Sequence, residues 1–227
     1  MITFKQFLSE ALEVQDAREF FRKEAGPFVQ QAKGHGVFLR GADNKPPTIA
    51  RVELPSGRVV DVGMMSVRKD RIPMNMPKDF HLAADEWMKG KFGIAGRTGA
   101  AFVLGEDGRR TAESYGEYLY AVIPRGDFKF IWSPEVEDLF DQYHNGGMRD
   151  AVKGLTGEEF NAAVTAELEK INYTDEDLPG ALDSENEVMI ECEYLLVVDV
   201  TDSEGDADGY GAMDSRTAIR ELKEALK

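Results

Sequence analysis

Cysteine, long apolar runs and basic residues are all scarce in this chain. Its 227 residues include one cysteine, Cys192, which excludes an internal disulfide framework and fits a reducing compartment. Because Cys192 stands within an apolar, strand-like run, we expect a small buried side chain and not a nucleophile. No apolar run reaches the roughly 18 residues of a membrane span, so we expect a soluble protein with no membrane partner.

The shortage of basic residues constrains the partners. The chain has 27 Lys and Arg against 42 Asp and Glu, which gives a formal net charge of −15. Because nucleic-acid backbones are bound largely through Lys and Arg, this charge opposes a nucleic-acid partner. A local basic patch at 68–71 still leaves a nucleic acid open as a substrate.

Several catalytic and metal-binding motifs are also missing. The sequence has no phosphate-binding loop, no GxSxG turn and no HExxH helix, which removes the common nucleotide-triphosphatase, hydrolase and metalloprotease classes. Its three histidines lack metal-ligand spacing. The stretch 204–209 resembles the opening of a calcium loop, but Ser215 occupies the place of the closing glutamate. We therefore expect no metal site and interpret 202–211 as an acidic loop.

The length and the hydrophobic periodicity predict one main domain with short additions at both ends. We expect an N-terminal helix over 1–14, a domain over 15–200, and an acidic loop with a C-terminal helix over 201–227. Apolar spacing predicts helices at 16–31, 79–93, 135–143, 157–171 and 215–226, strands at 37–40, 100–104, 118–124, 128–132 and 188–200, and a hairpin over 49–62. This mixture indicates an α+β protein.

Two polar motifs stand at the ends of apolar strands. The strand 37–40 ends in Arg40, which is followed by Gly41, and a planar guanidinium there can hold a phosphate or ribose while glycine admits a ligand to the backbone. Glu185 and Glu187 stand at the mouth of the run 188–200. A carboxylate fixed at a strand start is well placed to stabilise positive charge.

An arginine early and a Glu-x-Glu before an aliphatic run late give the chain a resemblance to the ADP-ribosyltransferase superfamily of the arginine, serine, glutamate type. The resemblance spans roughly residues 37–200. It implies a split, mostly antiparallel sheet, preceded here by an N-terminal helical arm, that binds NAD as the substrate in a cleft. It also implies that Arg40 and Gly41 hold the dinucleotide.

The same resemblance implies a separate role for each glutamate. Glu187 would stabilise the oxocarbenium-like ribose as the bond to nicotinamide breaks. Glu185 would orient or deprotonate the acceptor, and the Glu-x-Glu form makes a protein arginine the leading acceptor. Glu191 and Glu193 repeat the spacing inside the run, and we interpret them as its solvated face.

The middle motif of the family, an aromatic-x-Ser-Thr-Ser strand, is altered in this chain. Phe102 occupies the aromatic place, but Leu104 and Gly105 stand where hydroxyls belong. Thr98 is the nearest upstream hydroxyl, and we take it as a candidate cofactor-binding residue. Phe102 or Tyr115 could stack on nicotinamide, although an aromatic residue in a strand is more often part of a core.

The first residues add a second resemblance. The segment 1–11 ends in Leu8-Ser9-Glu10 and is similar to the head-targeting leaders of internal proteins of tailed bacteriophages. An ordinary helix that docks on the core explains the same pattern. The leader would place the chain in the virion and then in the host cytoplasm, where a mono-ADP-ribosyltransferase would modify a host protein for host takeover. Two alternatives stay open: a non-catalytic phage structural or internal head protein that keeps the fold, and an acidic binding module that neutralises a host factor.

Overall fold

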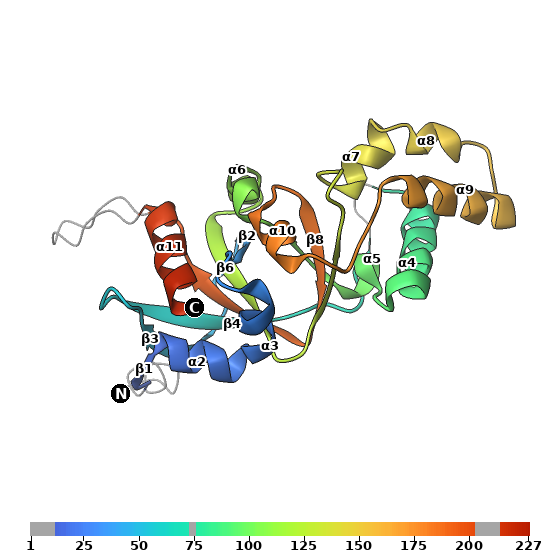
Figure 1. Cartoon of the computed structure of the whole chain (residues 1–227). Helices are drawn as coiled ribbons and strands as arrows, with labels where there is room; N and C mark the ends of the chain where they lie inside the picture. Colours follow the sequence, from blue (N-terminus) through green and yellow to red (C-terminus); the bar gives the residue numbers. More distant parts are fainter. Residues whose placement is uncertain (1–11, 73–75, 203–213) are drawn as a thin grey trace, which may run out of the picture.

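A nine-stranded sheet runs through the computed structural model, which describes residues 12–72, 76–202 and 214–227 (Figure 1). The strands follow one another in space as β1-β3-β4-β9-β6-β2-β5-β8-β7. They are β1 (Val14–Asp16), β2 (Phe38–Ala42), β3 (Thr48–Glu53), β4 (Val59–Ser66), β5 (Ala101–Leu104), β6 (Tyr118–Arg125), β7 (Lys129–Trp132), β8 (Glu187–Glu191) and β9 (Tyr194–Asp199). The pair β1–β3 is parallel and the other neighbours are antiparallel. The α+β class and the mostly antiparallel sheet are thus confirmed.

Ten helices are described, some packed on the sheet and some gathered beside it. They are α2 (Ala17–Glu24), α3 (Gly26–Ala32), α4 (Lys78–Phe92), α5 (Gly96–Gly99), α6 (Arg109–Glu113), α7 (Leu139–His144), α8 (Met148–Ala151), α9 (Gly157–Lys170), α10 (Leu178–Asp183) and α11 (Ser215–Ala225), with a 3₁₀ turn η1 (Glu106–Gly108). The helices α4, α7, α8 and α9 lie together beyond the β7 edge of the sheet, and we call them the helical lobe (Figure 1). In the parts of the chain that the structure describes, no helix is long and apolar enough to cross a membrane.

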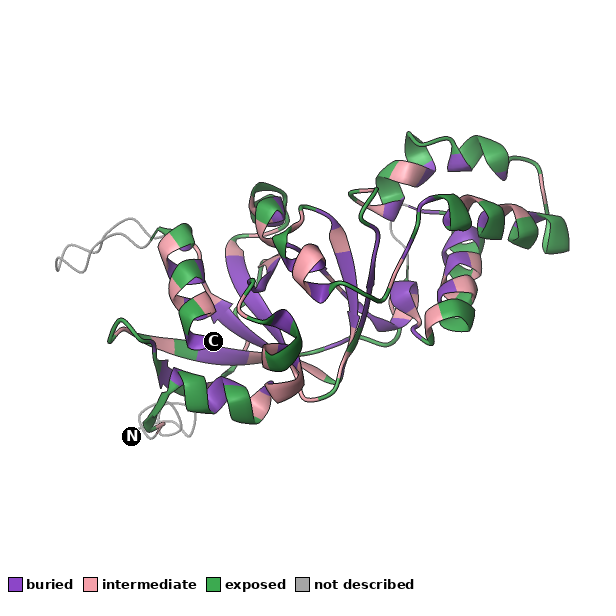
Figure 2. Cartoon of the chain, viewed as in Figure 1, coloured by how far each residue is buried: buried purple, intermediate pink, exposed green. Residues whose placement is uncertain are grey.

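Two apolar cores meet at strand β8 (Figure 2). The larger core joins the sheet to α2, α3 and α11, and Ile190 of β8 belongs to it. The smaller core fills the helical lobe and includes Met189, which directly precedes Ile190 in β8. Successive side chains of a strand point to opposite faces, so β8 is buried on both. A residue at its start is therefore held by the packing of both cores.

The N-terminal part differs from the sequence prediction. The predicted helix 1–14 and its leader lie mostly outside the described residues, and in the described part Val14 begins strand β1. The single helix predicted over 16–31 is two helices, because Gly26 and Pro27 follow Ala25 and proline cannot continue the first helix. Pro27 instead occupies the first turn of α3, where its missing N–H costs nothing.

The long strand predicted over 188–200 is also two strands. The chain bends at Cys192 and Glu193, after which β9 pairs with β4 and β6 instead of with β5 and β7. The bend could not be seen in the sequence, because both strands are buried on both faces and their residues form one continuous apolar run. Cys192 is buried, as expected, and burial raises the pKa of its thiol to about 12.

A third difference concerns the helix predicted over 135–143. Ser133, Pro134 and Glu135 have the residue pattern of a capped helix start, and the Ser133 hydroxyl does accept a hydrogen bond from the backbone N–H of Glu135 at 3.1 Å. The helix nevertheless begins only at Leu139, where the side chain of Asp138 accepts from the N–H of Asp141. The pattern Ser-Pro-Glu therefore makes a turn here and no helix.

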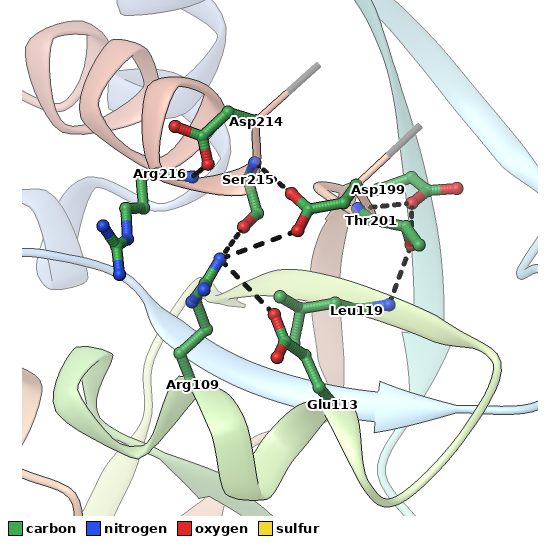
Figure 3. Close-up of polar contacts among 9 residues, drawn as sticks. Arg109, Glu113, Leu119, Asp199, Thr201, Asp214, Ser215 and Arg216 are labelled. Atoms are coloured by element: carbon green, nitrogen blue, oxygen red, sulfur yellow. Dashed lines mark hydrogen bonds and ion pairs between the residues drawn. The ribbon is translucent and has the colours of Figure 1, made fainter. Parts of the chain in front are cut away.

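The C-terminal helix closes onto the short helix α6 (Figure 3). Arg109 donates to the hydroxyl of Ser215 and lies 3.4 Å from the Glu113 carboxylate and 3.9 Å from that of Asp202. The N–H of Ser215 also donates to Asp202 at 2.6 Å. These contacts join residues on both sides of 203–213, the range that holds most of the predicted acidic loop and lies outside the described residues.

Gly90 offers a test of how α4 is packed. A Cβ at Gly90 would meet nothing within 4 Å, whereas one at Gly96 would lie 2.7 Å from Met88 Sδ. Because glycine weakens a helix interior, Gly90→Ala is expected to raise the free energy of unfolding by roughly 0.5–1 kcal/mol. Urea denaturation measures it, and Gly96→Ala, which must displace Met88, serves as the destabilised comparison. A loss of stability in Gly90→Ala would contradict the open surface described.

Candidate active site

The three strands that carry the motifs are consecutive neighbours in the sheet, in the order β2-β5-β8. Leu39 of β2 pairs with Leu104 of β5, and Leu104 pairs with Glu187 of β8. The first of these is the one Cα pair that β2 and β5 share, so the sheet is continuous but narrow at this junction. The topology therefore brings Arg40 and Glu187 to two strands that flank a common neighbour.

Arg40 bridges the narrow junction. Its Nη1 donates to the carbonyl oxygen of Phe102 on β5 at 2.6 Å, in a region where β2 no longer pairs with β5. Burial lowers the pKa of Arg40, and its Nε is buried without a hydrogen-bond partner among the described residues. Part of the donor capacity of this guanidinium is thus unused.

Two further arginines lie over the ring of Phe102. The guanidinium carbon of Arg71 is 3.8 Å from the ring centroid and that of Arg97 is 4.5 Å from it. Both distances are within the range of cation–π attraction. Burial, followed by the charges of Arg40 and Arg97, lowers the pKa of Arg71 to about 10. Phe102 therefore organises a group of mutually repelling cations.

Glu187 is the partly buried anion of this group. Its Oε1 accepts from Arg97 Nη1 at 3.0 Å, and the two side chains are 17% and 8% exposed. Burial raises the pKa of Glu187, and Asp138 adds to this, while the charges of Arg97 and Arg71 act in the opposite direction. Arg40 and Glu187 share no direct ion pair within the described residues and are connected through Phe102 and Arg97.

Thr98 is bound to a carboxylate of α4. Its hydroxyl donates to Asp85 Oδ2 at 2.5 Å, and the N–H groups of Thr98 and Arg97 donate to Asp85 Oδ1 at 3.3 and 2.8 Å. The structure thus gives Thr98 a part in holding the turn α5, one residue away from the arginine that contacts Glu187.

Gly41 and Tyr115 lie where α6 closes onto β2. A Cβ at Gly41 would clash with the carbonyl oxygen of Ala112 and lie 3.1 Å from Tyr115 Cβ, so glycine here permits close packing of α6. Tyr115 itself is 62% exposed. Partial burial, then the negative charges of Asp138 and Glu187, raise the pKa of Tyr115, which places its ring in the same electrostatic surroundings as Glu187.

The altered middle motif has a structural cause. Leu104 is buried in the larger core. A Cβ at Gly105 would collide with the carbonyl oxygens of Ala181 and Ser184, at the end of α10. Position 105 therefore has no room for a serine or threonine while α10 packs as it does.

The other glutamates of the two Glu-x-Glu motifs lie at opposite ends of β8. Glu185 is exposed and stands two positions before the start of β8, next to the buried Asn186. Glu191 stands opposite Lys129 at the other end of β8, about 13 Å along the strand from Glu187, and Glu193 is exposed beyond it. The second pair is therefore remote from the arginines.

Comparisons of the chain with protein-family models, curated proteins and solved structures give no match. The site must therefore be interpreted from its own chemistry. A hollow of about 510 Å³ exists elsewhere, on the helical lobe beside Tyr143, Arg149 and Lys153. We place the candidate site at Glu187, because a buried carboxylate among arginines is more specific than an open surface hollow with mixed charges.

Sequence reasoning missed Arg71, Arg97, Asp85 and Asp138 as members of this site. Arg71 was noted only as part of a basic patch. The signal for Arg97 was present, since an arginine in the glycine-flanked stretch 96–99 directly precedes strand β5. Nothing in the spacing, however, connects it to Glu187.

Proposed function

We propose that the chain is a mono-ADP-ribosyltransferase that moves ADP-ribose from NAD to an arginine of a host protein. The observation that carries the proposal is the adjacency of β2, β5 and β8, which brings Arg40, Phe102 and Glu187 to one part of the sheet. Breaking the bond between ribose and nicotinamide develops positive charge on the ribose. A fixed carboxylate at Glu187 would stabilise that charge without reorganising during the reaction.

The arginines support binding of the dinucleotide. Arg40 binds the backbone carbonyl of Phe102 and Arg71 lies over its ring, in a chain whose formal net charge is −15, while Arg97, over the same ring, is already paired with Glu187. Burial and then the charges of Arg40 and Arg97 lower the pKa of Arg71, so the neighbouring guanidinium groups repel one another. The diphosphate of NAD would relieve the repulsion, because guanidinium groups form strong paired hydrogen bonds with phosphate oxygens.

Two observations favour a non-catalytic protein with the same fold. Gly105 has no room for the hydroxyl that the family motif carries, and Glu187 is already paired with Arg97. A protein that had exchanged catalysis for packing would show both features. The virion role rests on the leader resemblance of 1–11, outside the described residues, and stays a prediction.

The test of the proposal is incubation of the purified chain with NAD labelled in the adenylate part and a lysate of the bacterial host. Transfer of label to discrete proteins, with release of nicotinamide, is the expected result. Sensitivity of the label to hydroxylamine would identify an arginine linkage. Neither labelled protein nor released nicotinamide would remove the transferase and leave the non-catalytic candidate.

The two glutamates of the motif are expected to separate in this assay. Glu185→Gln should lose transfer to protein but retain slow hydrolysis of NAD, because water needs less orientation than a guanidinium does. Glu193→Gln removes an equally exposed carboxylate remote from the site and should behave as the unchanged protein. Nicotinamide release with and without lysate measures both activities. Equal loss of hydrolysis and transfer in Glu185→Gln would contradict its assignment to the acceptor.

A further inference from the structure

We propose that Arg97 is the positioning residue that orients the Glu187 carboxylate towards the ribose, and that Asp85 holds Arg97 in place for this purpose. The inference rests on the proposed function. It goes beyond the family motif, in which Arg97 and Asp85 have no part.

The turn that carries Arg97 is wedged between α4 and the sheet. A Cβ at Gly96 would lie 2.7 Å from Met88 Sδ and 3.0 Å from both Ile131 Cδ1 and Met189 Sδ. These atoms belong to α4, β7 and β8. The backbone just before Arg97 is therefore fixed against three elements at once.

Asp85 completes this anchorage. The four-residue helix α5 has no side-chain cap of its own, and its residue before the first turn is Ala95. The carboxylate of Asp85 instead binds the N–H groups of Arg97 and Thr98 and the Thr98 hydroxyl. Three hydrogen bonds to one charged group are strong and directional. They fix the root of the Arg97 side chain from a different element, α4.

Arg97 in turn is the direct donor to the Glu187 carboxylate within the described residues. The cross-strand neighbour of Glu187 is Leu104, whose side chain has no hydrogen-bonding group. Where the family would have a hydroxyl beyond Leu104, Gly105 has none. The orientation of the carboxylate therefore depends on a group from outside the sheet, and α5 supplies it.

Other titratable groups near Glu187 act through space. Asp138 lies before α7, Arg71 follows β4, and the phenols of Tyr115 and Tyr173 follow α6 and α9. Asp138 favours the protonated carboxyl and Arg71 the ionised one. A buried carboxylate needs a hydrogen-bonded cation to stay ionised, and Arg97 has that contact.

The experiment compares Arg97→Met, Arg97→Lys and Asp85→Asn with Lys89→Met, which removes an exposed cation from the same helix α4. Two quantities are measured on each full-length chain. One is the pH profile of NAD hydrolysis, with kcat and KM determined separately. The other is the titration of the Glu187 carboxyl by NMR on ¹³C-glutamate-labelled protein without NAD, with Glu187→Gln assigning the resonance.

Arg97→Met is expected to lower kcat by about 100-fold, since a misplacement of about 1 Å has that effect, while KM for NAD changes far less. The pKa of Glu187 should rise, which moves the acidic limb of the profile to higher pH. Asp85→Asn should act in the same direction, Arg97→Lys should recover part of the loss, and Lys89→Met should change nothing.

An unchanged Glu187 titration in both Arg97→Met and Asp85→Asn would overturn the inference. If Arg97→Met fails to fold, Asp85→Asn and Arg97→Lys decide it by the same criterion. If the unchanged chain never cleaves NAD, the proposed function fails. The titration then still shows whether Arg97 holds Glu187, so the two failures are distinguishable.

Discussion

Glu187→Gln lowers the rate of ADP-ribose transfer by about 100- to 1000-fold and leaves the affinity for NAD nearly unchanged, if the proposed function is correct. A carboxylate that acts on charge developed in the transition state contributes little to binding of the ground state. Glutamine keeps the size of the side chain and a hydrogen-bond acceptor for Arg97. Nicotinamide release gives the rate, and isothermal titration with NAD gives the affinity.

Two further variants serve as comparisons for Glu187→Gln. Arg40→Ala should weaken NAD binding, because Arg40 would hold the dinucleotide and not the reacting carbon. Glu191→Gln changes a half-buried carboxylate at the far end of the same strand, β8, and should keep full activity. Equal losses of affinity in Glu187→Gln and Arg40→Ala would contradict the roles assigned. An active Glu187→Gln with an inactive Glu191→Gln would move the motif to the second glutamate pair.

Gly105→Ser, which restores a hydroxyl of the family motif, is expected to destabilise the fold and not to raise activity. Its Cβ would meet backbone carbonyl oxygens of Ala181 and Ser184, which cannot rotate away as a side chain would. Overpacking of this kind costs about 1–3 kcal/mol, and contact with backbone belongs at the upper end. Thermal unfolding followed by circular dichroism measures the loss.

Gly26→Ser is the matched control, because a Cβ at Gly26 meets nothing within 4 Å. A stable and more active Gly105→Ser would mean that α10 is displaced easily, and it would weaken the case for a non-catalytic relative. A stability loss confined to Gly105→Ser would show that packing of α10 excludes the hydroxyl.

The strands that carry the candidate site could be predicted from the sequence, but the residues that contact Glu187 in the fold could not. Apolar runs ending in Arg40 and beginning after Glu187 are local signals, and both strands formed there. Arg97 contacts Glu187 across 90 positions and is held by Asp85 across 12. Such contacts depend on the order of strands in the sheet, which no local period specifies.

The predicted start of a helix was wrong where a tertiary contact competed with the local sequence signal. Ser133 and Pro134 have the composition of a helix start, yet the Ser133 hydroxyl also donates to Ile171 O at 2.6 Å, far away in sequence. That contact ties the Ser133 turn to the end of α9, and the helix begins only after Asp138. Tertiary contacts of this kind override local propensity.

The position of β9 affects how the chain can fold while it is being synthesised. This strand is the last among the described residues, yet it lies inside the sheet between β4 and β6. A nascent chain that ends before residue 194 therefore presents two unpaired edges, which are templates for aggregation. The pairing of Val62 and Val122 with β9 spans long stretches of sequence, and such non-local pairing is slow to form. We expect the sheet to close only after β9 has been synthesised, and chaperones would protect its open edges until then.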